Sequence, residues 1–192
     1  MEIKNNGQNG LQIIGKKETV LVNPSGDTLK KSSSRVILYN RKVETGLLTM
    51  ENKVLIIGPG EYEVGGVEIN GHNDGESGVV YSVAIDGLTV AILGSMKGEL
   101  SEKKIDKIGA ADVLLADISG CGESQSKVLL KLAKKWGINY LLPYGQRIGG
   151  TEIHDFLNVA DNEGLEPVSS LKMDKDTLPE GMETVLLKET LT

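Results

Sequence analysis

Apolar residues in the first half of the chain occur in short runs separated by polar turns. Residues 11–14 and 19–22 are apolar and flank a polar tetrapeptide, which is typical of a β-hairpin. Residues 79–85 and 88–93 flank Asp86-Gly87, and Asp-Gly is a dipeptide typical of a tight hairpin turn. Further patterns predict strands at 35–39, 54–57 and 61–69 and a turn at 23–27. The first half of the chain is therefore expected to form hairpins.

The second half of the chain changes to a pattern in which strands alternate with helices. Residues 124–136 give the clearest helix, because one set of side chains recurs at helical spacing: Val128, Leu129, Leu132, Ala133 and Trp136. Gly137 ends this helix. Other patterns predict helices at 101–108 and 151–164 and strands at 113–116, 139–142 and 183–188. Hairpins followed by alternating strands and helices predict one α/β domain spanning residues 1–192.

Composition and charge exclude several classes of partner. With 27 acidic and 21 basic residues the formal net charge is −6, so the chain has no general attraction for nucleic acid or anionic lipid. Cys121 is the only cysteine, which excludes an intrachain disulfide and a cysteine-rich zinc site. The sequence begins without a signal-like apolar run and contains no apolar stretch of about 20 residues. We therefore predict a cytoplasmic protein with no nucleic-acid and no membrane partner.

Four segments carry a resemblance to a known family. Residues 54–67 contain Ile-Gly-Pro-Gly-Glu-Tyr-Glu, residues 80–94 form a hairpin ending in Leu-Gly-Ser, residues 108–115 lead into an apolar strand, and residues 156–187 contain Glu-Pro-Val and Leu-Pro-Glu. In this order they resemble the short Zn-dependent hydrolase branch of the metallo-β-lactamase superfamily over nearly the whole chain. The resemblance implies a metallo-β-lactamase-like αββα four-layer sandwich, an α/β fold with its site at one edge.

The side chains that bind metal in this family look replaced. Members that hydrolyse use histidines and aspartates to hold one or two zinc ions, which lower the pKa of bound water to about 7. The resemblance sets against those ligands, in chain order, Arg41, Val43, Thr45, Gly46, Ser95 and Gly145. An arginine has no lone pair to donate, and valine and glycine have no side-chain ligand atom. We therefore expect no metal and no other cofactor.

A count of histidines leads to the same expectation without any alignment. The chain has only two, His72 and His154, and a histidine-rich dinuclear site cannot be built from two. His72 and Asp74 could bind a metal weakly, although we favour a polar turn without a ligand. For His154 we favour a role on the surface of a helix or in its packing, and for Cys121 that of a passive thiol.

Two basic residues lie in the segment that the resemblance aligns with the metal-binding loop of the family, and they suggest another function for the cleft at that edge. Arg41 and Lys42 could bind an anion such as a phosphate or carboxylate, or they could ion-pair with Glu44 or Glu61 and close the cleft. We favour closure. The candidate ligand-binding residues are Arg41, Lys42, His72, Asp74, Ser95 and Tyr144, and no catalytic residue is assigned. Glu61 and Glu63 could form an acid–base pair, but we favour a structural role for them.

Three functional hypotheses follow from these observations. The first is a degenerate metallo-β-lactamase-fold protein without a zinc site, which binds a small molecule or a protein partner, or acts in assembly, and is not an enzyme. The second is a hydrolase whose site has been relocated or is completed by a partner subunit. The third is a small-anion binder that uses Arg41 and Lys42. Whether the chain forms a homo-oligomer is left open.

Overall fold

One six-stranded sheet, sheet A, is built mainly from the N-terminal part of the chain. The computed structural model describes residues 1–7, 10–41, 51–73, 78–94, 109–145 and 150–190. Sheet A has the strand order β12-β1-β2-β3-β4-β5, with the bounds β1 Glu2–Asn5, β2 Leu11–Ile14, β3 Thr19–Val22, β4 Val36–Leu38, β5 Val54–Ile56 and β12 Leu171–Lys172. Strands β2 and β3 form the predicted antiparallel hairpin, whereas β3, β4 and β5 are parallel.

A seven-stranded sheet, sheet B, packs against sheet A. Its order is β13-β11-β10-β9-β8-β7-β6, with the bounds β6 Gly60–Val64, β7 Val67–Asn73, β8 Val79–Ile85, β9 Leu88–Leu93, β10 Val113–Asp117, β11 Tyr140–Tyr144 and β13 Glu183–Thr184. Strands β8 and β9 form the hairpin predicted from Asp86-Gly87, where both turn residues have positive φ, 54° and 79°. Strands β9, β10 and β11 are parallel.

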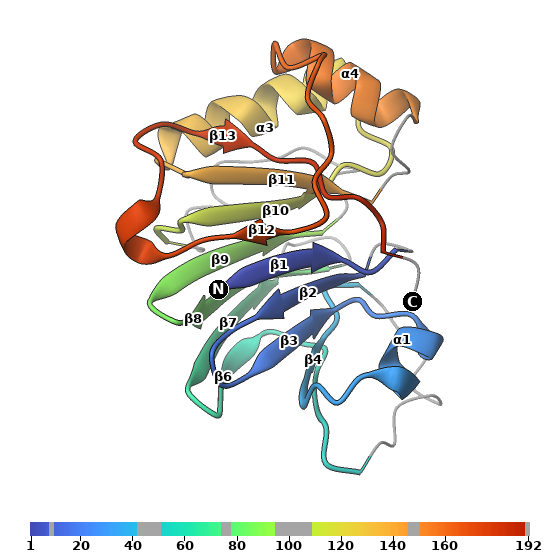
Figure 1. The fold of residues 1–192 in the computed structure, drawn as a ribbon, viewed down its shortest axis with the longest axis vertical. Coiled ribbons are helices and arrows are strands. Elements are labelled where there is room, and N and C mark those ends of the chain that lie inside the picture. Colours follow the sequence, from blue (N-terminus) through green and yellow to red (C-terminus); the bar gives the residue numbers. More distant parts are fainter. Residues whose placement is uncertain (8–9, 42–50, 74–77, 95–108, 146–149, 191–192) are drawn as a thin grey trace.

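Helices cover the outer faces of the two sheets (Figure 1). The long helix α3 (Glu123–Lys135) and α4 (Thr151–Val159) lie on sheet B, and the short helix α1 (Gly26–Lys31) lies beside sheet A. A 3₁₀ turn, η2 (Lys175–Thr177), precedes β13. This arrangement is the four-layer sandwich of the metallo-β-lactamase-like fold. Among the described residues, no helix is long and apolar enough to cross a membrane.

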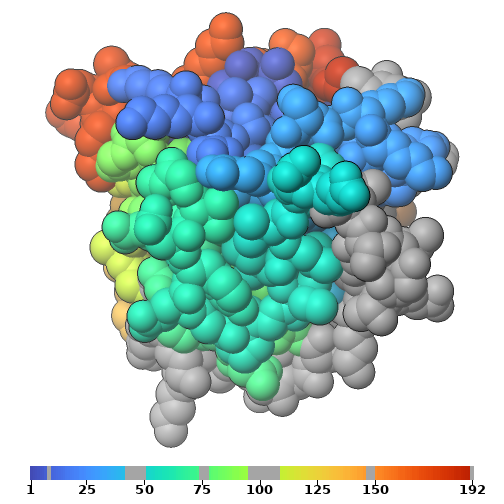
Figure 2. Space-filling model, turned by 90° about the horizontal axis from the view of Figure 1, so that it is seen from below, coloured from blue at the N-terminus to red at the C-terminus, as the bar shows by residue number. Residues whose placement is uncertain are grey.

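Aliphatic side chains fill the space between the sheets, as the scarcity of aromatic residues requires. A single cluster of buried residues joins sheet A to sheet B, and its fully buried members include Ile13, Val20, Leu38, Ile69, Val83, Val90 and Leu115. A second cluster joins sheet B to α3 and α4. The chain from β5 to β7 forms much of the face in Figure 2 (cyan to green). Val54 and Ile57 are exposed.

Several predicted elements need correction. The segment predicted as a turn at 23–27 leads into α1, because the Ser25 hydroxyl caps this helix by accepting a hydrogen bond from the Thr28 amide. Val128 was expected to pack in the core, but it is exposed, and Leu130 is buried in its place. Strands β1 and β12 were missed, because β1 has a single apolar residue, Ile3, and β12 has only two residues. The predicted helix at 101–108 lies outside the described residues.

Candidate functional site

The carboxyl ends of the parallel strands from both sheets meet at one edge of the sandwich, which we call the rim. In sheet A, Asn23 follows β3 and Asn40 lies two residues after β4; in sheet B, Leu93 ends β9 and Tyr144 ends β11. Each apolar strand stays buried up to this edge, and a polar side chain comes directly after it or close behind. Sites in such folds lie beyond the carboxyl ends of strands, so the rim is the place to look for function.

Two buried asparagines pair with each other at the sheet A side of the rim. The Asn23 side-chain amide donates to Asn40 Oδ1 at 2.7 Å, and the Asn40 backbone amide donates to Asn23 Oδ1 at 3.2 Å. Their exposed fractions are only 1% and 3%. Because an unpaired buried amide is costly, this reciprocal pairing is what allows two polar side chains to stay here. Asn23 has a φ of 47°, a conformation that asparagine tolerates better than most residues.

A hydrogen-bonded bridge connects this pair to sheet B. Asn40 Nδ2 donates to the Tyr144 hydroxyl at 3.3 Å, and that hydroxyl donates to the Leu93 carbonyl at 3.0 Å. Burial raises the pKa of Tyr144, and the nearby Asp117 carboxylate raises it further, so the phenol stays protonated and can donate. We call Asn23, Asn40 and Tyr144 the inter-sheet junction. It closes the sandwich with neutral groups.

Next to the junction, the chain leaves no room for a side chain at position 145. Gly145 has a φ of 94°, and a Cβ atom there would overlap the Asp117 carboxylate and the Ser119 hydroxyl. That space is occupied by a turn in which the Ser119 amide donates to Asp117 Oδ1 at 2.9 Å and the Ser119 hydroxyl lies 2.8 Å from the Gly145 carbonyl. The position that the family resemblance aligns with the last histidine ligand is therefore closed by the protein itself.

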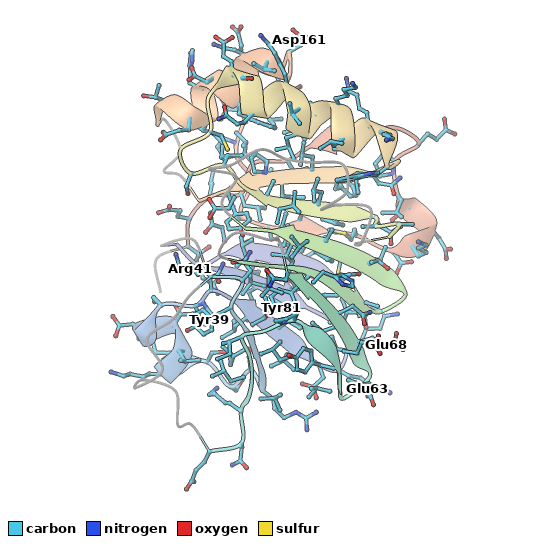
Figure 3. The ribbon with its side chains drawn as sticks, turned by 180° about the vertical axis from the view of Figure 1, so that it is seen from behind. Tyr39, Arg41, Glu63, Glu68, Tyr81 and Asp161 are labelled. Carbon is cyan, nitrogen blue, oxygen red and sulfur yellow. The ribbon has the colours of Figure 1, made fainter. Side chains whose placement is uncertain are left out.

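The predicted cationic pair is described only in part. Arg41 is exposed at the rim, directly after Asn40 and on the same side as Tyr39 (Figure 3). Burial raises the pKa of Tyr39 and of Tyr144, and the Arg41 charge acts on both phenols in the opposite direction, so Arg41 lies near each of them. Within the described part of the chain, no ion pair joins Arg41 to Glu61, the closure that we favoured. Lys42 and Glu44 lie outside the described residues.

His72 and Tyr144, two further predicted residues, lie on opposite faces of sheet B. His72 is on β7 with its side chain on the helix side of sheet B, as its register partner Val80 belongs to the cluster under α3 and α4. Tyr144 belongs to the opposite, inter-sheet face, four strand spacings away, which is about 19 Å. Asp74 and Ser95 lie outside the described residues, so their proposed roles stay predictions.

The residues for which we favoured structural roles are either buried or exposed on elements other than those that form the inter-sheet junction. His154 is exposed on α4, where its Nδ1 lies 3.2 Å from the Asn158 side-chain amide. Cys121 is only 2% exposed, in the cluster beside the helices. Glu61 and Glu63 are both exposed on β6, and Figure 3 shows Glu63 at the other end of the strands from Arg41. None of these residues is placed to cooperate with the inter-sheet junction.

The described residues do not fit a zinc ion. No group of three histidine, cysteine, aspartate or glutamate side chains among them could hold a metal. Both histidines of the chain are described, and neither faces the space between the sheets. Asp117 is the carboxylate at the rim that the structure describes, and its Oδ1 is engaged by Ser119. Histidine and carboxylate ligands converging on one point, which zinc requires, are therefore missing from this part of the rim.

Sequence reasoning missed the residues that build the junction and the neighbouring turn. Asn23, Asn40, Asp117 and Ser119 were not among the candidates, although each comes at or just after the carboxyl end of an apolar strand. That position was the available signal, because the ends of parallel strands converge on one edge of a sheet. It could not indicate that Asn40 would bond to Asn23 on the same sheet and to Tyr144 on the other sheet, since these partners are 17 and 104 residues away in the chain.

Comparison with protein families decides the ancestry of this chain. A family model described as a beta-lactamase superfamily domain matches residues 2–144, three quarters of the sequence. The chain belongs to the β-lactamase superfamily. The matched segment includes both sheets up to Tyr144, and therefore the whole inter-sheet junction. A search of curated proteins found no significant match.

Solved structures of superfamily members share the fold over nearly the full length. A protein from Thermotoga maritima, named for the Zn-dependent hydrolases of the metallo-β-lactamase superfamily, has 21% identity and a TM-score of 0.77, covering 98% of this chain and 99% of that one. A protein from Parabacteroides distasonis, named as a metal-dependent hydrolase, has 13% identity and a TM-score of 0.66, with 98% and 93% covered. The metallo-β-lactamase fold protein YhfI from Bacillus subtilis has 11% identity and a TM-score of 0.63, with 97% and 96% covered.

Proposed function

We propose that this superfamily member has lost the zinc centre and acts as a binding or assembly protein instead of a hydrolase. The observation that carries the proposal is the inter-sheet junction, in which Asn23, Asn40 and Tyr144 satisfy one another between the sheets. Catalysis by a zinc-bound water needs ligand side chains with free lone pairs at this edge. Here the buried polar groups are amides and a phenol that bond across the two sheets, and none of them is a histidine or a carboxylate.

Two features of the chain support the proposal that several of the family's metal-binding side chains have been lost, and not a single one. Gly145 cannot be replaced by a ligand residue without displacing the Asp117–Ser119 turn, so this position has been rebuilt together with its neighbours. Arg41 brings a permanent positive charge to the same edge, which opposes binding of a divalent cation. A fold can persist after its chemistry is gone, because function resides in the site and not in the framework.

Metal analysis of the purified protein tests this proposal. The protein is expressed in medium supplemented with zinc, manganese and iron, purified without chelator, and analysed by inductively coupled plasma mass spectrometry. We expect each metal far below one equivalent per chain, and no gain after incubation with zinc and removal of the excess. Near-stoichiometric retention of any of the three would contradict the proposal. A zinc-binding superfamily hydrolase, handled in parallel, shows that the procedure preserves bound metal.

The alternative of a hydrolase with a relocated or partner-completed site predicts a different result. Such an enzyme should cleave at least one member of a panel of phosphodiesters, esters and lactams, and a variant such as His72→Ala should abolish the cleavage. Our proposal predicts that the wild type and His72→Ala show no turnover above that of buffer without protein. Turnover that depends on His72 would favour the hydrolase.

A further inference from the structure

The exposed cation at the rim has no partner within the described part of the chain. Arg41 follows the buried Asn40 directly, yet it forms no ion pair or hydrogen bond with a described residue, although a neighbouring rim residue, Asp117, carries a carboxylate. The other described arginine, Arg35, is paired with Glu18. A guanidinium presents five donors in a planar fork, which suits two oxygen atoms of one anion. Arg41 thus keeps its donors available for a ligand.

Beside Asn40, the residue before Arg41, an added methyl group would fit without overlap. Asn40 uses one of the two hydrogens on Nδ2 for Tyr144, so that its amide keeps a second donor. On this side stands Gly94, where a Cβ atom would lie 3.5 Å from the Asn40 carbonyl oxygen and 3.6 Å from Nδ2, without overlap. A small-residue position therefore lies beside the Asn40 amide, and the cation Arg41 follows Asn40 directly in the chain.

From this arrangement we propose that the rim binds a small oxyanion, a carboxylate or a phosphate, with Arg41 as its anchor beside the amide of Asn40 and the gap at Gly94. The inference rests on the proposed function, since it names the ligand class of the edge that has lost its metal. An anion would then bind at the edge of the sandwich where the resemblance places the metal ions of the family. Binding there involves no bond cleavage.

The charges near Arg41 set the expected strength of binding. Asp117 lies close enough to Tyr144 to affect the phenol, so one negative charge stands near the same bridge and weakens the attraction for an anion. The net charge of −6 acts in the same direction at long range. We therefore expect affinity in the millimolar range, dominated by direct contact with the guanidinium fork.

Nuclear magnetic resonance titration of the full chain tests the proposal. Inorganic phosphate and acetate are added at constant ionic strength, and the backbone amides with the arginine Nε–Hε signals are followed. We expect saturable shifts at Arg41 and Gly94 for at least one anion. Arg41→Gln should weaken binding about tenfold or more, since a charge-assisted hydrogen bond contributes roughly that factor. The control Arg35→Gln removes the same charge elsewhere and should leave the affinity unchanged.

A second variant keeps the charge and fills the gap. Gly94→Ala places a methyl group over the Asn40 amide with no clash, so the protein should fold normally and bind the anion more weakly. Unchanged affinity in Gly94→Ala would overturn the proposed position. Absence of saturable shifts for both anions, or equal weakening by Arg41→Gln and Arg35→Gln, would overturn the site itself. These results are independent of metal analysis: a protein that binds neither metal nor anion refutes only this inference, and a metal-loaded protein refutes the proposed function.

Discussion

The space between the two sheets is closed in two different ways along the length of the strands. In the middle it is filled by aliphatic side chains such as Ile13, Val90 and Leu115, which need no directional partner. At the rim it is closed by the junction of Asn23, Asn40 and Tyr144, in which each polar group depends on a specific neighbour. The middle preserves the framework of a superfamily, whereas the rim is the region where we propose that the metal site has been lost. Stability and function should therefore respond differently in the two regions.

Truncation in the middle is expected to have the largest effect on stability. Leu115 on β10 is fully buried between the sheets, so Leu115→Ala leaves a cavity and should lower the free energy of unfolding by about 3 kcal/mol. Urea denaturation measures this loss. The control Val128→Ala, at a residue that is 38% exposed on α3, should change stability by less than about 1 kcal/mol. Equal losses would mean that the cluster between the sheets is not the main core.

Adding one carbon atom at the rim should cost nearly as much. Gly145→Ala combines an unfavourable φ of 94° with overlap at Asp117, and should lower the free energy of unfolding by about 2 kcal/mol. Gly66 is a matched control, because its φ is 84° and a Cβ atom added there would meet nothing within 4 Å. Gly66→Ala should show the backbone strain alone, about 1 kcal/mol. If both variants lose the same amount, position 145 is not closed by its neighbours.

Removing a single hydroxyl tests the bridge across the sheets. Tyr144→Phe leaves the Leu93 carbonyl without its donor and Asn40 Nδ2 without its acceptor, which should cost about 1.5 kcal/mol. The measurement is again urea denaturation at neutral pH. Tyr140→Phe is the control: this phenol, on the same strand, makes no hydrogen bond that the structure describes. An unchanged midpoint in Tyr144→Phe would show that the junction contributes nothing to holding the sheets together.

The smallest expected effect is a loss of stability at alkaline pH that arises from Tyr144 at the rim. Burial raises the pKa of Tyr144 above the ordinary value of 10.0, so the folded state holds this proton longer than the unfolded state does. The stabilisation is complete below about pH 10 and is lost as pH rises through the folded pKa, with a loss of at most about 1.4 kcal/mol on going from pH 10 to pH 11. Between pH 10 and pH 11 the free energy of unfolding of the wild type should therefore fall more steeply with pH than that of Tyr144→Phe. Parallel pH dependences would contradict a buried, protonated phenol.

The fold was largely predictable, because apolar runs bounded by turn residues predict most of its strands. The two hairpins and the helix α3 were predicted within one or two residues, and the resemblance supplied the four-layer arrangement. The strands β1 and β12 were not, since β1 has a single apolar residue, Ile3, and the edge strand β12 has only two residues. Their position depends on pairing between distant parts of the chain, Glu2 with Lys172 among them.

The candidate site was less predictable for a physical reason. Arg41 and Tyr144 were identified by aligning them with a family pattern, but their neighbours were identified only by three-dimensional contact. The Asn23–Asn40 pair and the Asp117–Ser119 turn consist of common polar residues, whose side chains acquire a role only from burial. The sequence also could not give the face of sheet B on which the His72 side chain lies, because side chains alternate between the faces of a strand; it lies on the helix side.

A crystal structure of the protein grown with excess zinc chloride, with diffraction recorded on both sides of the zinc absorption edge, tests the central claim most directly. The account predicts no anomalous peak between the carboxyl ends of β4 and β11, and an intact hydrogen bond from Asn40 to Tyr144. A zinc ion at that place, held by several side chains of this chain, would contradict it.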